Sequence, residues 1–320
     1  MRQHDFEDFD LFDDQPSRRP ARARRRGRFD EPEPTRSGRL TQAERVRLAK
    51  LRDDAYTENE LPEGADRWST WDDAEHGPLP RPDWVVTELA AVDTDLGVLK
   101  TGKEADVHLL RRALPGTPGA LLAAKRYRSD EHKLFHRDAG YLEGRRMRRS
   151  REMRAMAHRS AFGRNLIAEQ WAVAEFAALS RLWTLGAPVP YPVQREGMEL
   201  LLEFLGEEDG TAAPRLAQVR PDPDELTDLW FQATAALELL ASEGLAHGDL
   251  SAYNLLVHRG RLMVIDLPQV VDVVANPGGA EFLARDVRNL AGWFHGRGLG
   301  EHVTRTEELL AELVSAAGLA

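Results

Sequence analysis

Two aspartates and an asparagine in the second half of the chain have the types and spacing needed for chemistry on phosphate. Asp249 is followed five positions later by Asn254, and Asp266 comes after a further apolar run. Phosphoryl transfer needs an oriented hydroxyl and divalent metal spread over the phosphate oxygens, and little covalent help from the protein. Asp249 can orient the attacking hydroxyl, and the oxygens of Asn254 and Asp266 suit Mg²⁺. The set predicts a phosphotransferase active site.

The segment between Asn254 and Asp266 must bring the second aspartate back to the asparagine. Residues 255–265 contain two apolar runs separated by Arg259 and Gly260, which is typical of a β-hairpin. Because a hairpin reverses the chain, we expect the two metal ligands to lie on the same side of it.

A lysine in an apolar strand is the next candidate. Lys125 follows the apolar residues 121–124, and a buried lysine needs a charged partner. In enzymes with the set above, a lysine on the third strand contacts the α- and β-phosphates and is held by a glutamate on the following helix. Glu175 is the best candidate for that partner, and Glu169 is the alternative. A surface charge at a strand edge is the plainer interpretation of Lys125.

Two further segments can complete a nucleotide site, although each is a weak signal alone. Residues 101–107 contain a single glycine, and there backbone amides and the Thr101 hydroxyl can cap phosphate while Lys103 adds charge. Residues 203–206 end a strand and can offer the backbone donor and acceptor that adenine requires. An ordinary hairpin and an ordinary core strand fit these two segments as well.

The pattern around these residues predicts a small β-rich half followed by a helical half. Strands are expected at 96–100, 106–111, 120–127, near 193 and at 199–205, and helices at 167–183, 222–242, 280–294 and 305–317. This order fits an α+β, bilobal, protein-kinase-like fold. Its N-lobe would cover residues 81–205 and its C-lobe residues 206–320.

Composition limits the class of protein. The 320 residues include no cysteine, which excludes disulfides and thiolate chemistry and fits a reducing cytoplasm. No stretch approaches the roughly 18 apolar residues that span a bilayer, so no membrane association is expected. The formal net charge of −10 gives no support for nucleic-acid binding by the chain as a whole.

Charge is distributed unevenly along the chain. Residues 1–80 combine an acidic opening, an arginine run at 18–28 and proline-rich sequence, which predicts a disordered tail because too little apolar area is available for burial. A basic flexible loop is expected at 145–164. Solvated surface is the plainer interpretation of both basic stretches. An arm that binds RNA or an acidic partner is the alternative.

Taken together, these residues resemble the RIO family of atypical serine/threonine protein kinases. The resemblance spans residues 90–300 and follows the family's order of motifs. The motifs are TGKEADVH (101–108), AKRYR (124–128), residues 171–179, LEFLG (202–206), APRL (213–216), HGDLSAYNLLV (247–257), ID (265–266) and FLARDVRNL (282–290). The first string is the most family-specific, whereas aminoglycoside and choline kinases share one similar to the His-Gly-Asp string.

The resemblance implies an enzyme that uses ATP and Mg²⁺, with Mn²⁺ as an alternative metal. It would act as a non-specific serine/threonine protein kinase on a protein substrate or on itself, or mainly as an ATPase. Asp249 would be the general base, Asn254 and Asp266 would bind the metal, and Asp266 would be phosphorylated transiently. A cytoplasmic location is expected.

The resemblance also implies the nucleotide contacts. Lys125, held by Glu175, would bind ATP together with the loop that carries Thr101 and Lys103. Adenine would meet the backbone of the strand end at residues 203–205, through Glu203 and Leu205.

Supporting roles follow from the resemblance too. Asp286 would brace the catalytic loop from a helix, and the basic segments would carry an association with RNA or a ribosomal subunit. The sequence departs from the family pattern after Asp266, where Leu267 and Pro268 replace a glycine-containing pair. Because proline fixes φ and lacks an N–H, we expect a stiff metal loop.

Two other function classes stay open on the sequence alone. A small-molecule phosphotransferase of the aminoglycoside or choline kinase type would need further acidic helices, for which the residues after Asp266 leave little room. An RNA- or ribosome-associated binding protein that uses ATP only as a conformational switch is the other class, motivated by the basic segments.

Overall fold

The computed structural model describes residues 61–128 and 161–319, with side chains of the first helix described from residue 168 onward. All of them belong to one compact unit, Ser37–Ala320. Residues 1–60 of the tail predicted over residues 1–80, and most of the basic loop predicted at 145–164, lie outside the described residues.

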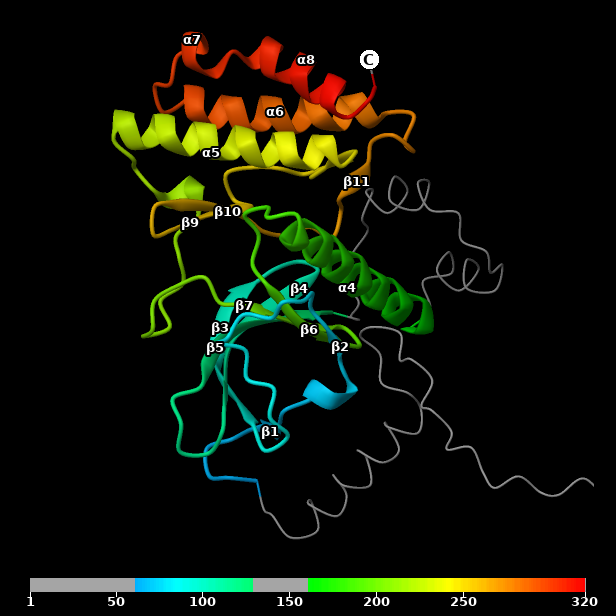
Figure 1. The fold of residues 1–320 in the computed structure, drawn as a ribbon, viewed down its shortest axis with the longest axis vertical. Helices are drawn as coiled ribbons and strands as arrows, with labels where there is room; N and C mark the ends of the chain where they lie inside the picture. Colours follow the sequence, from blue (N-terminus) through cyan, green and yellow to red (C-terminus); the bar gives the residue numbers. More distant parts are fainter. Residues whose placement is uncertain (1–60, 129–160, 320) are drawn as a thin grey trace, which may run out of the picture. The chain divides into compact units, whose positions relative to one another are not determined.

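The first half of the described chain forms a seven-stranded antiparallel sheet, drawn in the lower part of Figure 1. The strand order is β1-β3-β4-β5-β7-β6-β2. The strands are β1 Arg67–Trp68, β2 Glu75–His76, β3 Val92–Thr101, β4 Ala105–Ala113, β5 Ala120–Tyr127, β6 Pro192–Glu196 and β7 Glu199–Glu203. The strands that the sequence predicted are confirmed.

The alternation of side chains along β5 explains how the sheet is covered on both faces. Leu122 and Ala124 pack with Trp71 and Tyr191 in one buried cluster. Ala123, between them, faces the other way and packs against the main core, to which Tyr127 belongs. Because successive side chains of a strand point to opposite faces, Lys125 lies on the same face as Tyr127.

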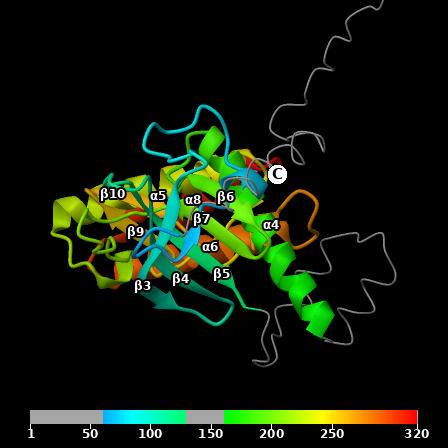
Figure 2. The same ribbon diagram turned by 90° about the horizontal axis from the view of Figure 1, so that it is seen from below.

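Helix α4, Ala161–Thr184, packs on the face of the sheet that carries Lys125. Its buried positions recur at helical spacing and include Ala168, Ala172, Phe176 and Leu179. Figure 2, viewed from below, shows α4 running alongside the strands. The predicted helix at 167–183 is confirmed, and it begins earlier than expected.

Residues 61–80 correct the boundary of the tail, which the sequence predicts to end at residue 80. They contain β1, the 3-10 helix η1 (Trp71–Asp73) and β2. β1 pairs with β3 and β2 pairs with β6, so both edges of the sheet are extended. Trp71 is buried and stacks on His76 at 3.8 Å between ring centroids. Two-residue strands give no alternating pattern, which is why the sequence did not reveal them.

The second half is helical, in the upper part of Figure 1, where α5, α6 and α8 lie side by side. The helices are α5 Pro223–Ser242, α6 Gly279–His295, α7 Glu301–Thr304 and α8 Thr306–Ala316, with a 3-10 helix, η2, at Leu216–Gln218. The Asp222 carboxylate caps α5 by accepting from the Asp224 and Glu225 N–H groups at 3.0 and 2.9 Å. Trp230 on α5 meets Phe294 on α6 with ring centroids 5.2 Å apart.

Two small sheets lie between the helices and the large sheet. β9 (Leu255–His258) and β10 (Arg261–Val264) form the predicted hairpin. Its turn residues Arg259 and Gly260 have φ values of 53° and 74°, as a two-residue type I′ turn requires. β8 (Leu245–Ala246) pairs with β11 (Val271–Asp272). These pairs fix the ends of the loops that carry the candidate catalytic residues.

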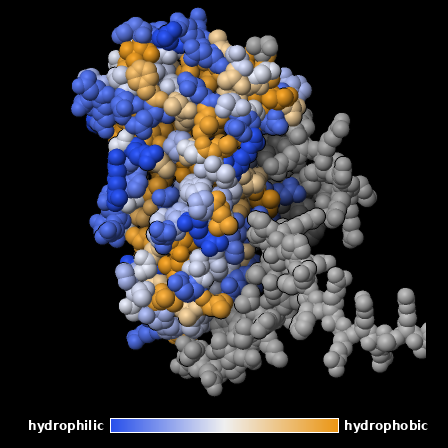
Figure 3. Space-filling view, viewed as in Figure 1, coloured by the Kyte–Doolittle hydropathy of each residue, from blue (hydrophilic) through white to orange (hydrophobic). Residues whose placement is uncertain are grey.

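The α+β bilobal protein-kinase-like fold, with a β-rich N-lobe and a helical C-lobe, is confirmed. On the face seen in Figure 3, hydrophilic and hydrophobic residues are interspersed over both halves. Within the described residues, every helix is too short or too polar to cross a membrane.

Candidate active site

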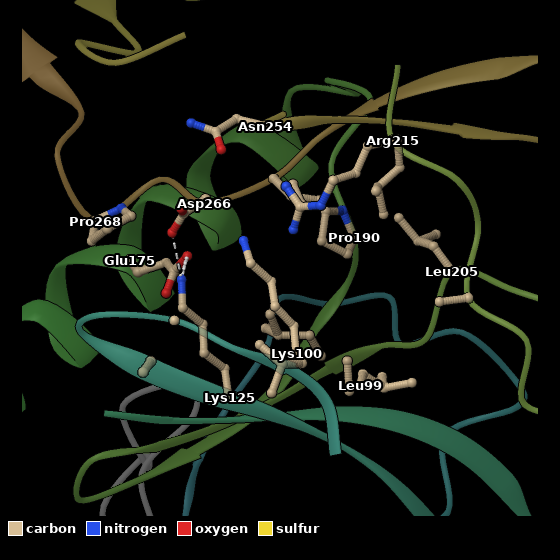
Figure 4. A pocket seen from close by; sticks show the side chains of 18 of the residues that line it. Leu99, Lys100, Lys125, Glu175, Pro190, Leu205, Arg215, Asn254, Asp266 and Pro268 are labelled. Carbon is tan, nitrogen blue, oxygen red and sulfur yellow. Dashed lines mark hydrogen bonds and ion pairs between the residues drawn. The ribbon is translucent and has the colours of Figure 1, made fainter. Parts of the chain in front are cut away.

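A cavity of about 1410 Å³ lies where the sheet, α4 and the loops of the helical half meet. Figure 4 shows it from close by. The nine residues that the sequence analysis assigned to catalysis, nucleotide binding and metal binding all line this cavity: Thr101, Lys103, Lys125, Glu175, Glu203, Leu205, Asp249, Asn254 and Asp266. Residues up to 165 positions apart in the chain, from Thr101 to Asp266, therefore share one site.

Lys125 sits between two carboxylates at one end of the cavity. Its ammonium donates to Glu175 Oε1 at 2.6 Å and to Asp266 Oδ1 at 2.8 Å, as drawn in Figure 4. The expected pairing with Glu175 is present, whereas Glu169 is exposed on α4. Tyr127 donates its hydroxyl to Glu175 Oε2 at 2.5 Å. The glutamate is thus fixed on both oxygens, which fixes the direction of the lysine.

The charges of this group are mutually dependent. Burial lowers the pKa of Lys125, but the neighbouring Glu175 and Asp266 carboxylates outweigh burial and raise it. Burial raises the pKa of Asp266, but the attraction and hydrogen bond of Lys125 outweigh burial and lower it. Lys125 therefore stays a cation and Asp266 an anion at neutral pH, which suits the binding of phosphate and metal.

The loop that carries Asp249 is held by a buried aspartate. Asp286, fully buried on α6, accepts from the Gly248 N–H at 2.8 Å and from the Leu250 N–H at 3.0 Å. Asn289 donates to the Leu250 carbonyl at 3.1 Å. The bracing role that the family resemblance implied for Asp286 is present in the structure. One carboxylate thus fixes the backbone on both sides of Asp249.

Gly248 must be a glycine at this point of the loop. Its φ is +84°, a conformation that side chains rarely adopt, and a Cβ would lie 2.7 Å from the Gln269 carbonyl oxygen. The backbone before Asp249 therefore passes close to the segment after Asp266. The catalytic loop and the metal loop can approach one another only because this residue has no side chain.

Asn254 is positioned by its own loop. The side-chain nitrogen of Asn254 donates to the backbone carbonyl of Asp249 at 2.9 Å, and the backbone carbonyl of Asn254 accepts from the Ile265 N–H at 3.0 Å. Its amide oxygen thereby stays available to a cation. The hairpin returns Asp266 to the same cavity, as expected.

Asp266 occupies an unusual backbone conformation. Its φ is +67°, in the left-handed region that few residues other than glycine adopt and that aspartate tolerates better than most. Its side chain is 44% exposed, toward the cavity. The next residue, Leu267, is buried, and its N–H donates to Glu175 Oε1 at 3.2 Å. The loop is therefore attached on both sides of its sharpest bend, and the stiffness expected from Pro268 stays a prediction.

The oxygen donors in the cavity fit Mg²⁺. Within the described ranges no three His, Cys, Asp or Glu residues converge to hold a metal by themselves. Mg²⁺ does not need such a cluster, because it commonly binds through one or two carboxylates together with substrate phosphates and water. The Asp266 carboxylate and the Asn254 amide oxygen provide that kind of set.

The opposite end of the cavity is apolar and ends at the segment after β7. Leu99, Ala123, Leu202 and Leu205 line it. The Leu205 carbonyl accepts from the Ala213 N–H at 2.8 Å, whereas its own N–H has no hydrogen-bond partner within residues 61–128 and 161–319. An apolar slot with a free backbone donor suits a purine base.

Two cations in the middle of the cavity were missed by the sequence analysis. Lys100 and Arg215 line it, and Figure 4 shows both side chains pointing into the hollow. Lys100 is missed because the pairing of β3 with β4 shifts register between Val98 and Lys100. This irregularity lets the consecutive residues Leu99 and Lys100 both line the cavity, where a regular strand would turn one away. In the sequence, Arg215 stands out only as part of the APRL motif.

Comparison with known proteins shows that the chain is similar to the members of one protein family. A family model described as the RIO domain matches residues 123–308. The RIO-type serine/threonine-protein kinase Rio1 of Haloferax volcanii is 36% identical over 208 residues, which cover 65% of this chain and 65% of that protein. The serine/threonine-protein kinase RIO3 of Mus musculus is 35% identical over 142 residues, 44% of this chain and 27% of that protein.

The similarity to a third relative also covers only part of that relative's own length. The serine/threonine-protein kinase rio1 of Schizosaccharomyces pombe is 31% identical over 199 residues, 62% of this chain and 37% of that protein. The chain therefore spans 65% of the length of the Haloferax relative and well under half of the other two.

Proposed function

Because this chain belongs to the RIO family, we propose that it is an ATP- and Mg²⁺-dependent serine/threonine protein kinase of the RIO type, or mainly an ATPase of that type. The observation that carries the proposal is the contact of Lys125 with both Glu175 and Asp266. This arrangement joins the sheet, α4 and the metal loop in a cavity that Asp249 and Asn254 also line. Phosphoryl transfer requires these parts together.

In this proposal the nucleotide lies along the cavity. The apolar end takes adenine, which accepts from the Leu205 N–H and meets the backbone of Glu203. Lys125 binds the phosphates while Glu175 holds it in place. Thr101 ends β3 and Lys103 lies in the loop between β3 and β4, and both line the same cavity. Purine at one end and phosphate at the other fit the change from apolar to charged lining.

Asn254 and Asp266 would hold the metal. When bound, Mg²⁺ supplies positive charge that neutralises the phosphate oxygens. Asp266 offers a carboxylate kept ionised by Lys125, and Asn254 offers a neutral oxygen. The backbone position of Asp266 is fixed by the next residue, Leu267, whose N–H donates a hydrogen bond to Glu175.

Asp249 would orient the acceptor hydroxyl and take its proton as the new P–O bond forms. The bond between the γ-phosphorus and the bridging oxygen breaks, and ADP leaves with that electron pair. If the acceptor is a serine or threonine hydroxyl, the product is a phosphoprotein. If the acceptor is water, the product is phosphate. If the acceptor is Asp266, its ionised carboxylate oxygen forms the new P–O bond without losing a proton, and water then hydrolyses the transient acyl phosphate to free phosphate and the restored carboxylate.

The acceptor and partners belong to the proposal as well. A protein substrate or the chain itself is the proposed acceptor, and a cytoplasmic location is proposed. The comparisons do not favour the small-molecule phosphotransferase. Association with RNA or a ribosomal subunit depends on basic segments that the structure does not describe, and it stays a prediction from the sequence.

Radiolabelled ATP tests the proposed function. The chain is incubated with Mg²⁺ and γ-labelled ATP, and label is followed separately into the chain, into free phosphate, into a general protein substrate and into aminoglycosides or choline. We expect label in the chain, in a protein or in free phosphate, and none when EDTA removes the metal. Transfer only to the small molecules, or no turnover of ATP at all, would refute the proposal.

A further inference from the structure

We propose that Lys100 and Arg215 form a two-cation clamp that reads the phosphate chain of the bound nucleotide, so that the site selects by number of phosphates. This inference rests on the proposed function and deepens it. The two side chains enter the cavity from separate walls, as Figure 4 shows. They lie between the apolar end, marked by Leu99 and Leu205, and the end that carries Asp266.

Neither cation forms an ion pair with a carboxylate among the described residues. Within the described part of the chain, no hydrogen bond or ion pair links the Lys100 ammonium or the Arg215 guanidinium to another residue. Burial and the nearby Arg215 lower the pKa of Lys100, and burial lowers the pKa of Arg215, while the attraction of Asp266 offsets part of both shifts. Two cations therefore face one hollow, and the nearby Asp266 carboxylate that attracts them is hydrogen-bonded to Lys125 and to neither of them. An anion bound between Lys100 and Arg215 would offset the repulsion between these two cations.

Both side chains are carried by fixed backbone. The register shift in β3 turns Lys100 toward the cavity beside Leu99. The backbone of Arg215 forms an antiparallel β-bridge with Leu256 on β9, and the backbone N–H of Arg215 donates to Gln218 Oε1 at 2.9 Å. The clamp therefore joins the sheet to the hairpin that follows the catalytic loop. A chain of phosphates that contacts both cations would tie these two elements together.

The phosphate loop is poor in glycine, so side-chain cations are needed to attract the phosphates. Residues 101–107 contain one glycine, Gly102, so few backbone amides can approach phosphate as closely as a glycine-rich loop allows. Side-chain cations can supply the missing attraction. Arginine and lysine bind phosphate through charge-assisted hydrogen bonds, which are stronger than bonds between neutral groups.

The selected ligand class is a nucleoside polyphosphate. A base in the apolar end and a metal at Asp266 place the intervening phosphates beside the two cations. Adenosine would gain nothing from the clamp, AMP and ADP would gain part, and ATP the most. The clamp thus increases the gain in binding affinity with each added phosphate from adenosine to ATP, a series that we call the affinity ladder.

Isothermal titration of the full chain with adenosine, AMP, ADP and a non-hydrolysable ATP analogue, all with Mg²⁺, tests the clamp. Lys100→Gln and Arg215→Gln should each weaken binding of the ATP analogue roughly tenfold and leave adenosine binding unchanged. Lys100→Arg and Arg215→Lys keep the charge and should preserve most of the ladder. Arg111→Gln, which removes an exposed charge on β4, is the matched control and should bind like the wild type.

The outcomes separate the clamp from the proposed function. If wild type binds the ATP analogue and both Gln variants do too with an unchanged ladder, the clamp is wrong and the proposed function stands. Equal loss of affinity for adenosine and the ATP analogue would also overturn the clamp, because it would indicate a general disturbance of the pocket. If wild type binds no adenine nucleotide, both proposals fail. Thermal melting of each variant without nucleotide identifies any that does not fold, and the other position then provides the test.

Discussion

At the scale of single residues, the contact between Lys125 and Glu175 is the feature on which nucleotide binding depends. Glu175→Gln would remove the charge that holds the ammonium at 2.6 Å. We expect ATP affinity to fall roughly tenfold, since hydrogen bonds to charged groups contribute about 1.5–3 kcal/mol. Titration with a non-hydrolysable ATP analogue measures the effect.

Glu169→Gln is the matched control for this variant. Glu169 lies on the same helix and was the alternative partner, but it is exposed. Its replacement should leave ATP affinity at the wild-type value. An equal loss in both variants, or none in the Glu175 variant, would contradict the assignment.

The residue scale also shows where prediction from sequence succeeds. Lys125 and Glu175 could be paired because a strand alternates its side chains and a helix repeats its faces, and both elements are long enough to show the pattern. Lys100 could not be placed, because its direction depends on a register shift that no residue type in the sequence marks. Arg215 could not be placed either, since it lies outside regular structure and is fixed by a bridge to Leu256, far away in the chain.

At the scale of elements, the brace from α6 to the catalytic loop makes a prediction about stability and turnover together. Asp286→Ala leaves the Gly248 and Leu250 N–H groups without their acceptor. We expect the free energy of unfolding to fall by about 1–3 kcal/mol or more, because a buried donor loses its partner. Denaturant unfolding measures this, and an ATP turnover assay should show a parallel loss.

Arg288→Ala provides the comparison for that variant. Arg288 is exposed two residues further along α6, and its replacement should change neither stability nor turnover. Full turnover in the Asp286 variant at a concentration where it is folded would show that the brace does not position Asp249.

The strands of the N-lobe carry a pH-dependent contact. Burial raises the pKa of Asp95, but hydrogen bonds from Arg126, the Gly97 N–H and His108 outweigh burial and lower it from 3.8 to about 2. Because the folded pKa is depressed, this contribution to stability is fully present above the unfolded value of 3.8 and is lost as the pH falls toward 2.

The Asp95→Asn variant tests this contact. Its free energy of unfolding should depend less on pH between 4 and 2 than that of the wild type, measured by urea unfolding at each pH. Parallel curves for the two proteins would show that Asp95 does not contribute.

Among the elements, the turn residues decide which could be predicted. The β9–β10 hairpin was predictable because Arg259 and Gly260 separate two apolar runs. β1 and β2 were not, because each has two residues and its pairing depends on a distant strand. The start of the folded sequence was therefore placed too late.

At the scale of the whole molecule, the site exists only when both halves are in place. The sheet supplies Lys125, α4 supplies Glu175, and the loops of the helical half supply Asp249, Asn254 and Asp266. Their order along the chain and the sequence motifs predicted this convergence. The long-range pairing that brings them together, such as the contact of Leu267 with Glu175, could be learned only from the fold.

The central claim is that Asp249 acts on the acceptor while other residues bind the nucleotide. The most direct test measures ATP turnover and ATP affinity of Asp249→Asn beside the wild type, with Mg²⁺ present. A positioned general base contributes roughly 10²–10⁴-fold to a rate. The account predicts a loss of turnover of this size with ATP affinity close to wild type. Wild-type turnover in the variant would contradict it.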